Sequence, residues 1–425
     1  MKLLERKVLP NGMRMIFVPQ PENVATTILV LVEAGSKYET KNVNGLSHFL
    51  EHMCFKGTTK RPKAINIAGE LDGIGAEYNA FTSQEWTGYF VKVQAYQTEK
   101  ALEVISDLYL NPVFDVAEIE KEKGVVIEEL NMYEDLPSRR VQEFLMTLLY
   151  GDQPAGWDIG GNKEVIRKIT QNDFLNYRKA HYVAPATTIV VTGAFDPKKI
   201  APLVEKAFAS ISTGKKSSKL KTKESQASPA LMVRHKKSDQ THIAIGCRAF
   251  DAYDKRRYAL EVLSDILGGG MSSRLFQRVR EELGAAYYVR AGADLYSDHG
   301  FLAVSAGVDH QKLNIVIEAI LEELLRLTKE NVSPNELKRA KDHLTGKLLL
   351  GLETSDALAT YYGAQEILHE KLQTPEELMK KIQAVTGEEI KEVAQFMFQN
   401  KKLNMALIGP YENDEPFKKI FKFND

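Results

Sequence analysis

The stretch of sequence that decides the fold reads Leu46-Ser47-His48-Phe49-Leu50-Glu51-His52-Met53-Cys54. Its apolar residues recur at the i, i+3, i+4 and i+7 spacing of one helix face, at Leu46, Phe49, Leu50 and Met53. Asn44 and Gly45 suit the start of such a helix. The pattern therefore predicts a helix that packs this face on a core and leaves its other face available.

The other face of this helix carries residues that can bind a metal ion. His48 and His52 are four residues apart, so both imidazoles project from one side of the helix and can bind one metal ion. Glu51 lies in the same neighbourhood. The order His-x-x-Glu-His inverts the more familiar zinc helix and is the signature of the inverzincins. The motif thus predicts a metal site on this helix.

A catalytic zinc site uses three protein ligands and leaves one position open. The chain has only two cysteines, Cys54 and Cys247, far apart, which excludes a disulfide framework and a cysteine-type zinc site. The third ligand must therefore be a carboxylate or another histidine. One acidic helical segment supplies the candidates, which are Glu118, Glu120, Glu122, Glu128, Glu129 and Glu134. Glu122 and Glu129 are two helical turns apart, so one can bind the metal while the other orients a ligand or water; composition alone does not choose.

Chain length and net charge limit the number of domains and the class of partner. A chain of 425 residues exceeds what one hydrophobic core usually organises, so we expect at least two domains. The 56 basic and 57 acidic residues nearly cancel, which argues against nucleic acid or a membrane surface as a partner. No apolar run approaches the roughly 18 residues of a membrane span, and no signal core precedes Pro10. We expect a cytoplasmic protein.

The chain reads as two similar halves. Residues 211–229 are rich in Ser, Thr and Lys and almost lack apolar residues, so we interpret them as an exposed linker with solvated lysines. The order of elements on both sides is alike, with paired long helices expected at 98–110 and 116–133, and again at 312–329 and 334–351. We therefore predict an α+β protein with domains 1–213 and 230–425 joined by a linker at 214–229. In each domain, helices pack on one side of a mostly antiparallel sheet.

Several motifs together resemble a known family. The sequence H-F-L-E-H-M-C-F-K-G-T is followed by E-K-G-V-V-I-E-E, which ends at Glu129, and by L-G-G-G-M-S-S-R-L-F, which begins at Leu267. These motifs are similar to those of the M16 zinc peptidases, the pitrilysin or insulinase family. At two domains the chain resembles the bacterial M16B type and the beta subunit of the mitochondrial processing peptidase. The resemblance implies two homologous α/β-sandwich domains, arranged as half of a clamshell, in the LuxS/MPP-like metallohydrolase fold.

The resemblance also assigns roles at the metal site. It makes His48, His52 and Glu129 the ligands of one Zn²⁺ per chain, with Glu128 as the competing ligand. Glu51 becomes the general base, and Glu122 becomes a supporting catalytic carboxylate. The same ligand set would also accept cobalt or manganese.

Further resemblances concern the substrate. The segment from Gly75 to Ser83 matches the family's substrate-edge strand, so Asn79, Ala80 and Phe81 are expected to bind peptide. The second half lacks His-x-x-Glu-His, as the family's inactive repeat does, but Arg280 and Tyr287 match the pair that grips substrate near the scissile bond. The family usually has Gly-Leu-Ala-Tyr where this chain has Gly-Ala-Ala-Tyr, a mild departure.

Three functions remain open on this basis. The first is a zinc metalloendopeptidase that cleaves unstructured peptides and works as a homodimer with composite sites. The second is one subunit of a heteromeric processing peptidase. The third is a structural core subunit without catalysis. The presence of both motifs favours the first, because a protomer with both can complete its partner's site.

Overall fold

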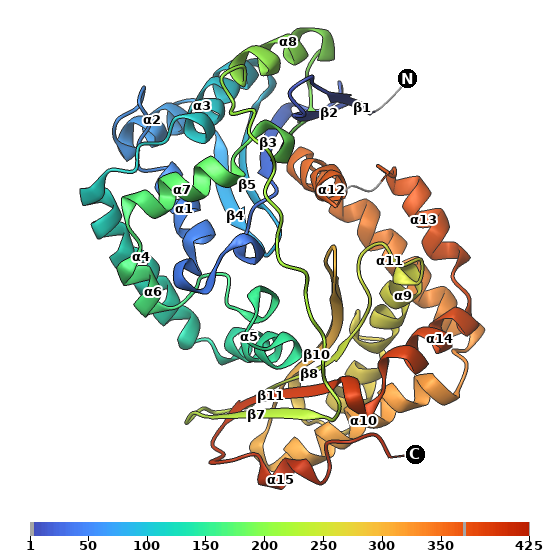
Figure 1. Cartoon of the computed structure of the whole chain (residues 1–425). Coiled ribbons are helices and arrows are strands. Elements are labelled where there is room, and N and C mark those ends of the chain that lie inside the picture. The colour runs from blue at the N-terminus through green and yellow to red at the C-terminus, as the bar shows by residue number, and fades with distance from the viewer. Residues whose placement is uncertain (1–3, 369–370, 425) are drawn as a thin grey trace. The chain divides into compact units, whose positions relative to one another are not determined.

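The computed structural model describes residues 4–368 and 371–424 and contains two compact units (Figure 1). The first unit comprises Met1–Asn131, Asp158–Leu220 and Leu350–Gln373, and the second comprises Met132–Trp157, Lys221–Leu349 and Thr374–Asp425. No helix among the described residues is both long and apolar enough to cross a membrane.

The first unit is built on a six-stranded sheet with the order β1-β2-β6-β3-β5-β4. Its β2 and β6 run parallel, and every other neighbouring pair is antiparallel. Its strands are β1 (Glu5–Val8), β2 (Arg14–Pro19), β3 (Ala25–Val32), β4 (Glu77–Thr82), β5 (Thr87–Gln94) and β6 (Thr187–Gly193).

The second unit repeats this topology in a five-stranded sheet with the order β7-β11-β8-β10-β9. The parallel pair is β7 and β11, which correspond to β2 and β6, and this sheet has no counterpart of β1 among the described residues. Its strands are β7 (Ala230–His235), β8 (Thr241–Arg248), β9 (Ala286–Leu295), β10 (Gly300–Val308) and β11 (Leu403–Gly409). The predicted fold class, two α+β repeats with mostly antiparallel sheets, is therefore confirmed.

The helices also follow one another in matching order. Helices between the strands of the first set are α1 (Leu46–Cys54), α2 (Ala64–Gly73), α3 (Thr98–Leu110), α4 (Val116–Glu134), α5 (Pro137–Tyr150), α6 (Lys163–Lys168) and α7 (Gln171–His181), and α8 (Pro197–Ala207) follows β6. Those of the second set are α9 (Arg257–Gly268), a π-helix (Phe276–Glu282), α10 (Leu313–Lys329), α11 (Pro334–Gly351), α12 (Ser355–Ile367), α13 (Pro375–Ala384) and α14 (Gly387–Met397), and α15 (Glu415–Lys418) follows β11. The four long helices predicted from periodicity lie where expected.

Strand β3 shows why the strands are apolar on both faces. Ile28, Val30 and Val32 point into the main core beneath α1 and α3, whereas Leu29 and Leu31 point into a second cluster formed with α12. An antiparallel strand with one solvated face would alternate apolar and polar residues. The continuous run Ile-Leu-Val-Leu-Val belongs to a sheet that is covered on both sides, so the expectation of helices on one side only is wrong for this sheet.

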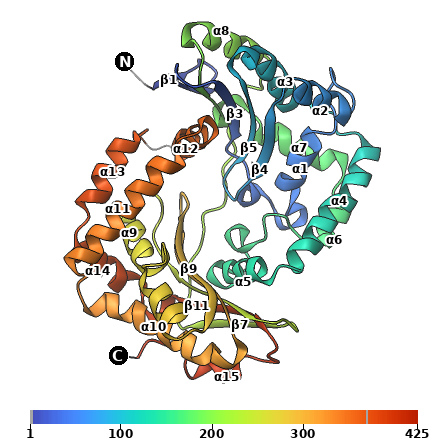
Figure 2. The same ribbon diagram turned by 180° about the vertical axis from the view of Figure 1, so that it is seen from behind.

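The second face is covered through an exchange of helices. Helix α12, late in the chain, packs on β3 and β6 of the first unit, while α5 packs on β8 and β11 of the second (Figure 2). A glycine permits each close approach. A Cβ on Gly363 of α12 would lie 2.4 Å from Leu31 Cδ1, and one on Gly246 of β8 would lie 2.9 Å from Leu145 Cδ2. The predicted domains, 1–213 and 230–425, would place α5 in the first domain and α12 in the second. No sequence pattern indicated that each helix packs in the other unit.

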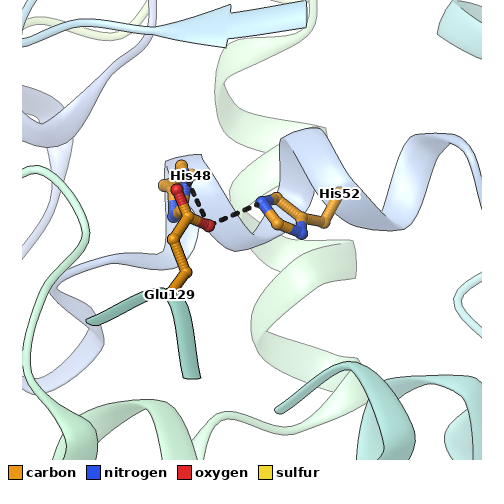
Figure 3. Close-up of side chains that lie close together, drawn as sticks. All are labelled: His48, His52 and Glu129. Carbon is orange, nitrogen blue, oxygen red and sulfur yellow. Dashed lines mark ion pairs between the residues drawn. The ribbon is translucent and has the colours of Figure 1, made fainter. Parts of the chain in front are cut away.

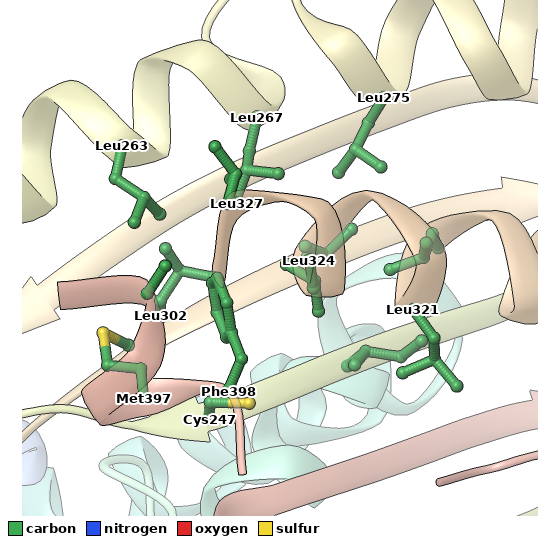
Figure 4. Close-up of a cluster of buried hydrophobic side chains, with 14 of the residues drawn as sticks. Cys247, Leu263, Leu267, Leu275, Leu302, Leu321, Leu324, Leu327, Met397 and Phe398 are labelled. Atoms are coloured by element: carbon green, nitrogen blue, oxygen red, sulfur yellow. The ribbon is translucent and has the colours of Figure 1, made fainter. Parts of the chain in front are cut away.

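The main core of the second unit lies between its sheet and helices α9, α10 and α14 (Figure 4). Leu263 and Leu267 of α9 meet Leu324 and Leu327 of α10 there, all at most 1% exposed. Cys247 is buried in the same cluster, and burial raises the pKa of its thiol to about 12. This cysteine is a core residue.

The linker forms no helix or strand from residue 212 to 229, as expected, but its lysines are not all solvated. Lys219 Nζ lies 2.5 Å from the carboxylate of buried Glu85, and Lys216 forms an ion pair with buried Glu33. The expectation of solvated charge is wrong for these two residues, because the linker lies against carboxylates of the first unit that need a cation.

Candidate metal centre

The metal-site helix α1 begins at a backbone position that requires glycine. Gly45 has φ of 97°, in the left-handed region. The buried Glu39 carboxylate accepts hydrogen bonds from the backbone N–H groups of Gly45 at 2.7 Å and Ser47 at 2.6 Å. Burial raises the pKa of Glu39 to about 7 despite these bonds. The carboxylate thus satisfies the free N–H groups at the helix start and holds the helix in place.

The histidines of α1 and a glutamate of α4 converge on one point (Figure 3). Glu129 Oε2 lies 3.6 Å from His48 Nε2 and 3.4 Å from His52 Nε2. Two donors of one tetrahedral zinc, each 2.0–2.1 Å from the ion, are about 3.3 Å apart. The three side chains are between 14% and 23% exposed, so water can reach the open position. The residues therefore fit a zinc ion.

A second carboxylate of α4 orients His52. Glu122 Oε1 lies 3.0 Å from His52 Nδ1, and Lys56 Nζ lies 2.6 Å from Glu122 Oε2. Burial acts to raise the pKa of Glu122, but the bonds with His52 and Lys56 outweigh it and hold that pKa below its usual range. An ionised carboxylate only accepts hydrogen bonds, so His52 carries a proton on Nδ1, and Nε2 is the nitrogen that faces Glu129 and can bind a metal once it has lost its own proton.

The charge balance at His52 suits exchange of a proton for a metal. Burial acts to lower the pKa of His52, but its hydrogen bonds with Glu122 and Glu129 raise that pKa to about 9. In the absence of a metal, the carboxylates therefore favour a positive charge at this point, and a cation bound between the same groups provides it.

The carboxylate of Glu51 is held by a threonine. Thr82, the last residue of β4, donates from Oγ1 to Glu51 Oε2 at 2.5 Å. Burial raises the pKa of Glu51, while the Thr82 bond acts to lower it. A carboxyl with a raised pKa next to a metal site is suited to proton transfer near neutral pH.

The other glutamates of α4 point elsewhere. Glu128, the competing candidate, is exposed and accepts a hydrogen bond from Asn131 at 3.2 Å. Glu118 and Glu120 pair with lysines of their own helix, and Glu134 pairs with Arg140. Of the six glutamates, the structure brings Glu122 and Glu129 to the histidines.

The predicted substrate strand is the outermost strand of its sheet. β4 pairs with β5 and is last in the strand order. Asn79 is exposed, and Ala80 is partly buried on the main-core side. The ring of Phe81 covers Gly88 of β5, where a Cβ would lie 2.3 Å from the ring, and packs with the α12 cluster. Phe81 therefore supports the strand by packing.

Arg280 and Tyr287 lie together in the second unit. The guanidinium carbon of Arg280 is 5.7 Å from the centroid of the Tyr287 ring, and 4.9 Å from that of Phe276. Arg280 belongs to a π-helix, a rare form that often marks functional positions, and Tyr287 follows at the start of β9. Tyr287 is 74% exposed, so its hydroxyl is available to a ligand.

Sequence reasoning missed three contributors to this site. Lys56 could have been found from the sequence, because it follows His52 by four residues and so continues the same helix face. In the structure it pairs with Glu122 of α4. Glu39 lies only six residues before Gly45, in the loop that leads into α1, but no spacing pattern marked it. Thr82 had no local signal, since it reaches Glu51 from a strand 31 residues further along the chain.

Known proteins match both halves of the chain. Residues 14–163 match the family described as insulinase (peptidase family M16), and residues 168–344 match the peptidase M16 inactive domain. The zinc protease YmxG of Bacillus subtilis is 35% identical over 97% of this chain and 99% of its own length. The chain belongs to peptidase family M16. A zinc protease of Mycobacterium leprae is 33% identical over 96% of this chain and 92% of its own length.

Solved structures share the M16 fold along the chain. A protease from Helicobacter pylori has a TM-score of 0.89 at 22% identity, covering 96% of this chain and 99% of that one. A peptidase M16 inactive domain from Pseudomonas fluorescens has a TM-score of 0.89 at 19% identity, covering 96% of this chain and 98% of that one.

Within the residues described here, His48, His52 and Glu129 form the only group of three or more candidate metal ligands.

Proposed function

We propose that this M16 protein is a zinc-dependent endopeptidase that cleaves unstructured peptides, with one zinc ion held by His48, His52 and Glu129. One observation carries the proposal, which is the convergence of both Nε2 atoms on a single Glu129 oxygen at 3.4 and 3.6 Å. The zinc proteases among its relatives support it.

The chemistry follows from the groups around the ligands. A bound zinc ion supplies Lewis acidity, which polarises a peptide carbonyl and makes a water molecule more acidic. Glu51 takes a proton from the attacking water and returns it to the nitrogen of the leaving amine. Thr82 holds one oxygen of Glu51, which leaves the other for the water. Glu122 keeps the Nε2 lone pair of His52 directed at the metal position.

The substrate is an extended peptide that adds to the edge of β4 at Asn79, Ala80 and Phe81. Hydrogen bonds to the strand's main chain give affinity with little sequence selectivity. Arg280 and Tyr287 donate to the oxygen on which negative charge develops, a kind of contact whose single loss costs about 100-fold or more in rate. In a homodimer, each protomer contributes this pair to the zinc site of its partner.

The first test compares wild type with Glu51→Gln on a flexible fluorogenic peptide. We expect Glu51→Gln to lower kcat by about 10²- to 10⁴-fold, the usual contribution of a general base, while zinc content stays at one per chain. Glu120→Gln, an exposed substitution on α4, serves as the control with wild-type turnover. Full turnover by Glu51→Gln would refute the mechanism, and an inactive, zinc-loaded wild type would favour the heteromeric or structural subunit.

A mixing experiment tests the composite site. Glu51→Gln protomers retain Arg280, and Arg280→Ala protomers retain Glu51. A mixed dimer is expected to recover one working site although each variant alone is inactive. Absence of any recovery in a verified mixed dimer would count against shared sites.

A further inference from the structure

The turn between β4 and β5 contains a buried negative charge. Glu85 is 1% exposed and lies in the turn from Ser83 to Trp86. The turn is tied to the loop after β3, since the N–H of Ser36 donates to Ser83 O at 3.2 Å and that of Lys37 donates to Gln84 O at 2.8 Å. A buried carboxylate of this kind needs a cationic partner to be stable.

The nearer cation comes from the linker. Lys219 Nζ lies 2.5 Å from Glu85 Oε1, whereas Lys37 Nζ lies 3.8 Å from it. The Lys219 side chain is 17% exposed, and its ammonium also lies 5.6 Å from the centroid of the Tyr38 ring. A linker residue thus supplies the nearer of the two cations beside this carboxylate.

The same turn fixes the threonine that holds Glu51. Thr82 directly precedes the turn and pairs across it with Thr87, whose hydroxyl donates to Ala34 O at 2.8 Å. Thr82 Oγ1 is 2.5 Å from Glu51 Oε2, so a shift of the turn moves this hydroxyl relative to the carboxylate. We propose that Lys219 is a positioning residue for Glu51, acting through Glu85 and Thr82; this inference rests on the proposed function.

The linker passes from the first unit to the second directly after Leu220, next to Lys219. Besides Lys219, the linker contacts the first unit through the Ser217 hydroxyl, which donates to Ala180 O at 2.9 Å. Thr222 is already anchored in the second unit, where its backbone N–H donates to Asp298 at 2.9 Å. Only Leu220 and Lys221 separate the two anchors.

The test is Lys219→Ala in the full chain with zinc, compared with Lys221→Ala at the exposed neighbouring lysine. We expect Lys219→Ala to lower kcat by about 10- to 100-fold, the scale of a misplacement of about 1 Å, with KM and zinc content unchanged. Lys219→Arg keeps the charge and is expected to recover most of the activity. Lys221→Ala is expected to match wild type.

A double variant separates positioning from a general loss of stability. If Lys219 acts through the Thr82 hydroxyl, Lys219→Ala in a Thr82→Val background lowers kcat no further than Thr82→Val alone. Should Lys219→Ala fail to fold, Lys219→Met with Glu85→Gln removes both charges and is expected to fold with the same loss of kcat. Additive effects with Thr82→Val, or wild-type kcat in a folded Lys219 variant, would overturn the proposal.

Hydrogen exchange provides a measure that needs no turnover. Amides in residues 82–87 are expected to exchange faster in Lys219→Ala than in wild type or Lys221→Ala, because the turn loses its nearer cation. If wild type were inactive, the proposed function would fail while this measurement still tested the turn. Unchanged exchange in that segment would refute the role of Lys219.

Discussion

Helices α1 and α4 occupy the same places in the order of elements as α9 and α11, yet the two pairs carry different chemistry. Between α1 and α4, two imidazoles face the Glu129 carboxylate. Between α9 and α11, Asp265 and His343 form one hydrogen-bonded pair at 2.7 Å. An Asp–His pair satisfies itself, whereas three converging lone pairs need a cation.

The comparison teaches that the fold does not depend on the metal. The second unit builds the same strand order and a complete core without a metal-type cluster among its described residues. We therefore expect the scaffold of the first unit to be stable without its metal ligands. Removing them should change chemistry much more than folding.

The largest expected effect comes from removing a metal ligand of the first unit, because the described residues of the second unit lack such a set. Glu129→Gln removes one ligand, so we expect zinc affinity to fall by more than about 100-fold, beyond the usual cost of losing an outer partner. Zinc titration with a competing chelator measures this, and Glu128→Gln is the matched control on the same helix. Circular dichroism of both zinc-free variants should equal that of zinc-free wild type. Unfolding of the protein on loss of zinc would show that the fold of the first unit depends on the metal, unlike that of the second.

A smaller effect is expected one step from the metal. Glu122→Gln keeps an acceptor for His52 but removes the charge that pairs with Lys56. We expect zinc affinity to fall by about 10- to 100-fold, with the ligand set intact. Competition titration should place this variant between wild type and Glu129→Gln, and Glu120→Gln should bind as wild type does. A loss equal to that of Glu129→Gln would show that Glu122 is itself a ligand.

The units also differ at the end of an equivalent helix, where α7 ends in buried His181 and α14 in buried Met397. Burial lowers the pKa of His181 to about 4. The unfolded chain therefore binds more protons between pH 6.5 and 4, so the free energy of unfolding falls as pH decreases through that window, by at most about 3 kcal/mol. His181→Met should remove this dependence in denaturant unfolding at pH 7 and pH 4.5. An identical pH slope in both proteins would contradict the burial argument.

The smallest expected effect concerns the exchanged helix of the first unit. Gly363→Ala places a Cβ 2.4 Å from Leu31 Cδ1, so we expect a loss of about 1 kcal/mol in the free energy of unfolding. Gly346→Ala, on α11 with no atom within 4 Å of its Cβ, should instead gain about 0.5–1 kcal/mol from helix propensity. Thermal unfolding measures both. Stabilisation by Gly363→Ala would mean that α12 does not pack as closely on Leu31 of β3 as the 2.4 Å contact implies.

Much of the fold was predictable because its signals are local. The apolar stripe of α1, the paired long helices and the repeated order of strands all follow from spacing within short windows. The exchange of α5 and α12 was not predictable, because an amphipathic helix shows which of its faces is buried and not which sheet covers it. The second covered face of β3 was not predicted either, since helices were expected on one side of each sheet.

The sequence by itself determined the metal-site helix, since the positions of His48, Glu51 and His52 on it depend only on helical periodicity. Periodicity also placed Glu122 and Glu129 on one face of α4 but could not choose between them. Only the tertiary structure decided that Glu129 faces both imidazoles while Glu122 bonds to His52. The reason is that the choice depends on the packing of α4 against α1, a contact between segments about seventy residues apart.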